Sequence, residues 1–71
     1  MSNETVFQPG VRVELVHTTD TDTRLVPGDQ GTVQRYRDSE DMGPEVGIRW
    51  DSGSNLSMLL DEGDIIRVVG S

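Results

Sequence analysis

The stretch between residues 45 and 58 constrains the fold of this chain more than any other. Within it, apolar side chains occupy every second position on both sides of a short polar segment that contains a glycine; these positions are Val46, Ile48, Trp50, Leu56 and Met58. Alternation with a period of two is typical of a strand with one buried face, and two such runs around a glycine-containing turn predict a β-hairpin. We expect the rest of the chain to be organised around this hairpin.

The phase of the alternation selects the loop of the hairpin. A three-residue loop, Asp51-Ser52-Gly53, puts the apolar positions of both strands on one face of the sheet. A two-residue loop would instead put Leu56 on the opposite face of the sheet from Trp50. Loops of this length usually end in a residue with positive φ, so Gly53 is expected to adopt that conformation. The predicted facing pairs are Trp50 with Ser54, Ile48 with Leu56, and Val46 with Met58.

The N-terminal part of the chain is polar over residues 1–9 and is predicted to be a flexible tail. Its Phe7 either closes one end of the core or remains a loose apolar residue. After the turn signal Pro9-Gly10, residues 11–16 alternate and predict a first strand, which a surface loop over residues 17–25 follows. The positions that this strand would bury are Val11, Val13 and Leu15.

Two glycines mark the start of the second strand. Pro27 followed by Gly28 suits a type II turn in which the glycine has positive φ. Gly31 indicates a close approach of two backbones. Val33 and Tyr36 are three positions apart, so the strand needs a bulge or a sharp bend at Gln34-Arg35 if both are to face the core.

Two acidic segments connect the C-terminal strands. Residues 38–44 are predicted to form a seven-residue loop before the central hairpin, and residues 61–64 a tight polar turn, with a 3₁₀ step as an alternative. The last strand would cover residues 65–69 and turn Ile66 and Val68 towards the core.

Five short strands without any helical period predict an all-β fold, with a single domain over residues 10–70. A long first connection followed by tight later ones favours a small five-stranded SH3-like barrel that is partly open, because closure hides the edges of short strands. The alternative is the five-stranded OB fold, although no room remains for a helix before the fourth strand.

Composition restricts the chemistry that is available. The chain has 71 residues, no Cys and a single His, His17. Without a thiol, a second imidazole or a glycine-rich phosphate loop, we predict neither an enzyme nor a bound cofactor. Asp20 and Asp22 resemble the start of a calcium loop, but the later ligands do not follow, so no metal site is predicted. The residues expected to be structural are Gly28, Gly31, Trp50 and Gly53.

Thirteen acidic residues against six arginines give a net charge of −7. Such a surface repels nucleic acid and membranes, and its origin could be solubility, adaptation to high salt or imitation of a phosphate backbone. No apolar run is long enough for a membrane span, and the N-terminus lacks the form of a signal peptide. We therefore expect a cytoplasmic protein, monomeric by default.

Three segments carry a resemblance to a known family: residues 10–16 (GVRVELV), 27–33 (PGDQGTV) and 48–56 (IRWDSGSNL). They resemble an uncharacterised family of small proteins that are frequent in bacterial phage and plasmid genomes, and the likeness covers roughly residues 9 to 69. A weaker likeness, through the Gly31-Thr-Val piece, is to KOW-type modules of transcription and ribosome proteins. The chain departs from the first family mainly in its longer, more acidic segment 38–44. The resemblance implies a fold and a mobile-element setting, but no activity.

The function that these features favour is a non-catalytic binding module with a protein partner. An alternative is an acidic inhibitor that imitates nucleic acid and blocks a host defence protein. In the SH3-like order the two acidic segments lie at the ends of adjacent strands, so their carboxylates, Asp64 included, could form a single negative face. A third is a KOW-like nucleic-acid binder, which the charge argues against. Arg35, Tyr36, Arg37 and Arg49 form either a small basic patch or ion pairs with nearby acids. The residues predicted to contact a partner are Leu25, Val26, Tyr36, Asp38, Glu40, Asp41, Met42 and Glu45.

Overall fold

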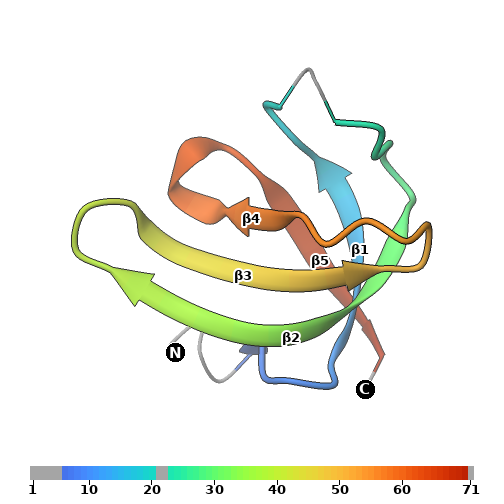
Figure 1. The fold of residues 1–71 in the computed structure, drawn as a ribbon, viewed down its shortest axis with the longest axis horizontal. Helices are drawn as coiled ribbons and strands as arrows, with labels where there is room; N and C mark the ends of the chain where they lie inside the picture. The colour runs from blue at the N-terminus through green and yellow to red at the C-terminus, as the bar shows by residue number, and fades with distance from the viewer. Residues whose placement is uncertain (1–5, 21–22, 71) are drawn as a thin grey trace.

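The computed structural model describes residues 6–20 and 23–70 and contains one antiparallel sheet (Figure 1). The sheet has five strands in the order β4-β3-β2-β1-β5 and does not close, so β4 and β5 are its two edges. The all-β class is thereby confirmed. The elements are β1 (Arg12–His17), β2 (Gln30–Ser39), β3 (Gly43–Trp50), β4 (Ser57–Leu59), the 3₁₀ helix η1 (Leu60–Glu62) and β5 (Ile65–Gly70).

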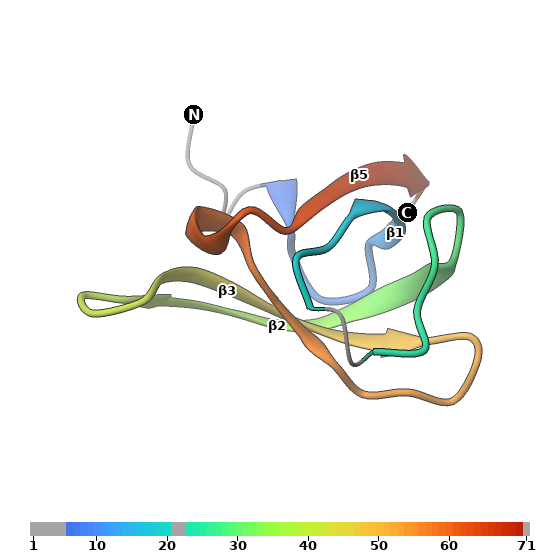
Figure 2. The same ribbon diagram turned by 90° about the horizontal axis from the view of Figure 1, so that it is seen from above.

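The sheet coils so that β1 and β5 lie above β2 and β3, and the core lies between these two layers (Figure 2). Trp50 is 1% exposed at the end of β3, and its Nε1 donates a hydrogen bond to the carbonyl oxygen of Leu56 at 3.0 Å. Trp50 is therefore a core residue whose polar atom is satisfied. The other buried apolar residues are Phe7, Val13, Leu15, Leu25, Val33, Val46, Ile48, Met58 and Ile66.

The central hairpin has the predicted register. Val46 pairs with Met58, and the amide of Trp50 donates to the carbonyl oxygen of Ser54 at 2.9 Å. Gly53 has a φ of +101°, as the three-residue loop requires. The second strand of the hairpin is shorter than expected, because regular pairing resumes only at Ser57.

The bulge in β2 is also confirmed. Val33 pairs with Ile48 and Arg35 pairs with Gly47, so one residue of β2 is extra between these pairs. Further back in β2, a Cβ on Gly31 would lie 2.9 Å from the Cα of Trp50, which is closer than side chains tolerate. The two paired strands can lie this close together here only because residue 31 is glycine.

The prediction of a seven-residue loop over residues 38–44 is wrong. Asp38 pairs with Pro44 and Ser39 with Gly43, so that only the three residues after Ser39 form the loop. Gly43, with a φ of +73°, closes this tight turn. The end of the β2–β3 hairpin projects beyond the rest of the sheet in Figure 2. Its side chains have no core to face on either side, so this segment lacks the alternation that reveals a strand with one buried face.

The two ends of the chain differ from expectation in opposite ways. Phe7 is 7% exposed and packs in the core, so the alternative of a loose residue is excluded, although residues 1–5 of the predicted tail lie outside the described residues. Val68 was expected on the core side but is 45% exposed. A register shift beside Val13 disturbs the pairing of β1 with β5 at this point, which turns the end of β5 away from the core.

Candidate functional site

A buried carboxylate organises the edge of the sheet at β4. Asp64 is 9% exposed, and its Oδ1 accepts hydrogen bonds from the hydroxyl of Thr18 at 2.9 Å and from the amide of Thr19 at 3.1 Å. Its Oδ2 accepts a hydrogen bond from the amide of Leu59 at 2.9 Å. Asp64 thus joins the start of the β1–β2 loop to the edge strand.

The hydrogen bond to Leu59 also shows which way the backbone of β4 faces. The amide of Leu59 points away from β3, because it donates to Asp64 instead. Successive residues of an antiparallel strand alternate in this respect, so Met58 bonds to Val46 on β3 and Ser57 turns its backbone outward like Leu59.

A groove runs along this edge, between the start of the β1–β2 loop and the tip of the β2–β3 hairpin. Apolar side chains line it: Leu56 just before β4, Leu59 in β4, and Met42 at the hairpin tip, which is 49% exposed. Asp20 and Glu62 lie at its rim, and no arginine belongs to its described lining. The groove therefore offers apolar contacts within a negative border.

The tip of the β2–β3 hairpin adds more negative charge at the same end. Glu40 and Asp41 are both exposed within the turn, and the side chain of Asp61 in η1 lies against Gly43 at the base of the tip. The two acidic segments therefore meet, which the sequence had indicated. Asp64, which was expected to share this negative surface, is buried and points inward.

The predicted partner contacts divide into four groups. Leu25 is 5% exposed and belongs to the core, so its assignment as a contact is wrong: the surface loop folds back and buries its last apolar residue. Val26 is 57% exposed but lies in the turn before the start of β2, whereas the hairpin tip follows the end of that strand. Tyr36 is half-buried against the core. The remaining predicted contacts lie on the β2–β3 hairpin and are Asp38, Glu40, Asp41, Met42 and Glu45.

Two of the arginines on the β2–β3 hairpin, Arg35 and Arg37, have different surroundings. The Nε of Arg37 lies 3.9 Å from Oε1 of Glu45, which agrees with the alternative that these arginines form ion pairs with nearby acids. The stem of Arg35 lies across Gly47, where a Cβ would be 2.9 Å from its Cγ. Gly47 is buried because the stem of Arg35 covers it.

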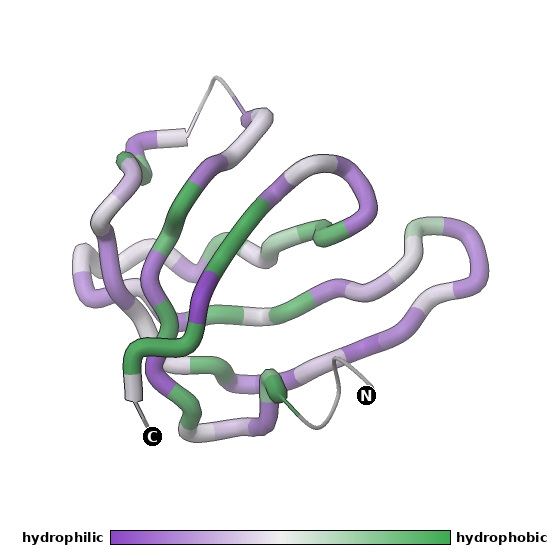
Figure 3. Tube along the Cα trace, turned by 180° about the vertical axis from the view of Figure 1, so that it is seen from behind, coloured by the Kyte–Doolittle hydropathy of each residue, from purple (hydrophilic) through white to green (hydrophobic). Residues whose placement is uncertain are grey.

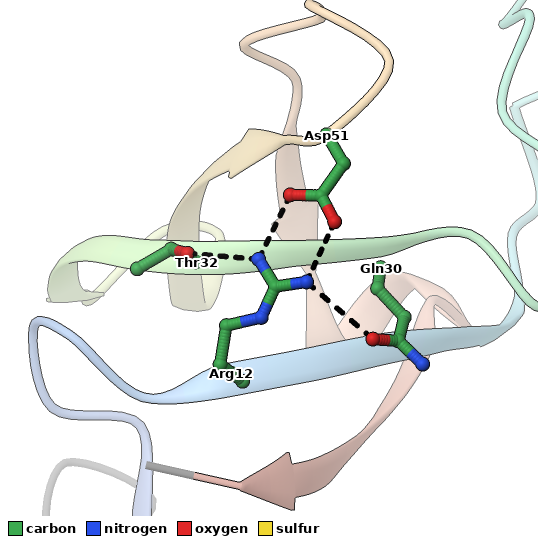
Figure 4. A network of polar contacts seen from close by, with 4 residues as sticks. All are labelled: Arg12, Gln30, Thr32 and Asp51. Carbon is green, nitrogen blue, oxygen red and sulfur yellow. Dashed lines mark hydrogen bonds and ion pairs between the residues drawn. The ribbon is translucent and has the colours of Figure 1, made fainter.

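Sequence reasoning missed a polar cluster at the other end of β3 (Figure 4). Both terminal nitrogens of Arg12 donate to Asp51, at 2.8 and 2.6 Å, and one of them also donates to Thr32 at 3.0 Å. The hydrogen bond from Arg12 lowers the pKa of Asp51, and the charge of the arginine acts in the same direction. Because the two residues are 39 positions apart, no local pattern could have paired them.

Comparison with known families shows to which family the chain belongs. Residues 4–69 match the family described as a domain of unknown function, DUF4314. The chain belongs to this family. No curated protein and no solved structure matches it. The match covers nearly the whole chain, including all of the sheet except Gly70 at the end of β5.

Two further observations concern only the described part of the chain. It contains no cluster of three or more side chains that could hold a metal ion, and the second aspartate of the calcium-like pair, Asp22, lies outside the described residues. None of its helices is long and apolar enough to cross a membrane.

Proposed function

We propose that this DUF4314 chain is a non-catalytic, cytoplasmic protein-binding module of a phage or plasmid, built as an SH3-like, partly open barrel. The order β4-β3-β2-β1-β5, a long β1–β2 connection and a 3₁₀ turn before the last strand support the SH3-like assignment. This part of the proposal is an analogy of fold, which by itself implies no function.

The groove along β4 is the observation that carries the proposed function. Met42 exposes an apolar surface at a projecting tip, and the neighbouring Leu56 and Leu59 continue this surface into the groove. Exposed apolar surface with a polar rim is typical of protein interaction sites. The acidic rim favours a partner segment that carries lysine or arginine beside an apolar side chain.

A second candidate function is supported by the meeting of the two acidic segments. Glu40, Asp41 and Glu62 are exposed at one end of the molecule, with Asp61 beside them. Such a surface could occupy the nucleic-acid site of a host defence protein. Binding would then depend mainly on charge, whereas the groove hypothesis requires the apolar side chain of Met42. A KOW-like nucleic-acid binder is the third candidate, which the net charge of −7 opposes.

The first step of the test locates the contact. A photo-crosslinking amino acid is placed at position 42 in the groove and, as the matched control, at position 26, which is also exposed but lies at the far end. Crosslinking in cells of the host should give a defined protein partner from position 42 and not from position 26. Equal products from both positions, or none from position 42, would contradict the proposal.

The second step measures the affinity of that partner at low and at high salt. The variants are Met42→Ala and the double change Glu40→Gln/Asp41→Asn. For the groove, we expect Met42→Ala to weaken binding about fivefold or more, since truncating a buried contact typically costs over 1 kcal/mol, with a modest effect of salt. Steep loss of affinity with salt and with the double change, but tolerance of Met42→Ala, would favour the nucleic-acid mimic instead.

A further inference from the structure

The edge of the sheet at β5 turns part of its backbone outward. On the neighbouring strand, both the amide and the carbonyl of Leu15 bond to the segment that leads into β2. Because antiparallel pairing alternates, Glu14 is the residue of β1 that exchanges hydrogen bonds with Arg67. The amides and carbonyls of Ile66 and Val68, on either side of Arg67, therefore face away from β1.

This edge lacks several of the devices with which proteins usually prevent further pairing. Such devices include very short strands, proline and lysine. β5 has six residues and contains neither proline nor lysine. Bulges near its two ends leave a regular segment around Arg67. The exposed apolar side chains along the strand are Ile65 (50%), Val68 (45%) and Val69 (40%).

The single charge of β5 is already neutralised. Arg67 donates to the carboxylate of Glu14 on β1, with its Nη2 3.2 Å from the nearer oxygen. Figure 3 shows the strand as two hydrophobic stretches with a hydrophilic position between them, which in the sequence of β5 is Arg67. In a chain of net charge −7, this strand is an edge without any carboxylate of its own.

We propose that β5 pairs antiparallel with β5 of a second copy of this chain. Two copies repel each other over most of their acidic surfaces, but at β5 no carboxylate is brought against another. The edge is also self-complementary, because β-branched side chains pack well opposite one another. A two-fold axis closes such an assembly after two copies.

The outward groups determine the register. With the axis at Arg67, Ile66 of one copy faces Val68 of the other, and every outward amide and carbonyl of these residues is paired. The two Arg67 residues are then directly opposite in a pair without hydrogen bonds, and each keeps its own Glu14. A single strand pair buries less than the roughly 1,200 Å² of a stable interface, so the dimer is weak.

A single engineered cysteine tests this register, because the chain has no cysteine of its own. Residues opposite each other without hydrogen bonds have Cα atoms about 4.5 Å apart, which a disulfide can bridge. Under mild oxidation, Arg67→Cys should form disulfide-linked dimers at least about tenfold faster than Val26→Cys, an exposed control at a distant turn. Equal rates would overturn the proposal.

A second measurement uses the chain without cysteine. Sedimentation at rising concentrations, up to about 1 mM, should show dimers that increase with added salt, because salt screens the repulsion between acidic copies. Proline is tolerated where an edge amide faces solvent, so Val68→Pro should keep the circular dichroism spectrum and weaken the dimer about tenfold. Val68→Lys serves as the second variant if the proline disturbs folding. A wild-type chain that stays monomeric throughout would overturn the proposal.

Discussion

The two edges of the sheet are protected in different ways. β4 has three residues, and the carboxylate of Asp64 accepts the outward amide of Leu59. β5 is twice as long, and no described side chain receives the outward amides of Ile66 and Val68. One buried carboxylate thus takes the place of a neighbouring strand at β4. Where the outward backbone groups of an edge strand already have hydrogen-bond partners, its side chains are what remains to bind a partner. Where those backbone groups have none, the edge can pair with another strand.

Removing the side chain of Trp50 should unfold the sheet, so that neither edge remains. Trp50→Ala truncates a fully buried aromatic, which costs about 3–5 kcal/mol. A domain of this size has only about that much stability, so we expect the variant to be largely unfolded at 25 °C by circular dichroism. A cooperative urea transition with an unchanged midpoint would show that Trp50 does not hold the layers together.

Asp64→Ala should release the β4 edge alone. The change leaves the amides of Leu59 and Thr19 without their acceptor, and we expect a loss of about 2–3 kcal/mol in the free energy of unfolding by urea. Glu62→Ala is the control, since it removes an exposed acid from the same connection and should change stability by no more than about 0.5 kcal/mol. Similar losses in both variants would refute the special role of Asp64.

Gly53→Val should strain the loop that carries β3 into β4. A β-branched residue resists the φ of +101° that Gly53 adopts, at a cost of about 1–3 kcal/mol. Space is not the reason, because nothing lies within 4 Å of a Cβ at this position. Ser52→Val is the matched control, and its urea midpoint should remain close to that of the wild type; an unchanged midpoint for Gly53→Val would contradict the backbone argument.

The smallest expected effect concerns the pair at the far end of β3. The hydrogen bond from Arg12 lowers the pKa of Asp51 below its ordinary value of 3.8, so the pair contributes stability above that pH and loses it as the pH falls through the lowered pKa. Asp51→Asn should therefore be less stable than the wild type at neutral pH, with a difference that shrinks in acid. Urea titrations from about pH 7 to pH 2 test this, with Asp38→Asn as an exposed control. A difference that persists unchanged in acid would exclude the ion pair as its cause.

Patterns of neighbouring residues were sufficient to predict much of the sheet. The alternation around Gly53 set the register of the central hairpin, and the spacing of Val33 and Tyr36 located the bulge in β2. These inferences succeeded because a strand with one buried face repeats every second residue. The same reasoning failed for residues 38–44, whose strands extend past the core and have no buried face to mark them.

The edges could not be predicted in this way. Asp64 bonds to Thr18, which lies 46 positions away, and in the sequence it is one acid among several in a polar turn. Val68 looks like a core residue by alternation until the bulge beside Val13 is known. Whether a carboxylate is buried or a valine exposed depends on pairing between distant strands, which is a property of the assembled sheet.

The measurement that tests the account most directly is amide hydrogen exchange, residue by residue, in a dilute sample where copies do not pair. The amide of Leu59 should exchange slowly because it bonds to Asp64, and that of Arg67 slowly because it faces β1. The amides of Ile66 and Val68 should exchange much faster, and they should become protected as the protein concentration rises. Fast exchange at Leu59, or protection of Ile66 and Val68 equal to that of Arg67 at every concentration, would contradict a sheet with one closed and one open edge.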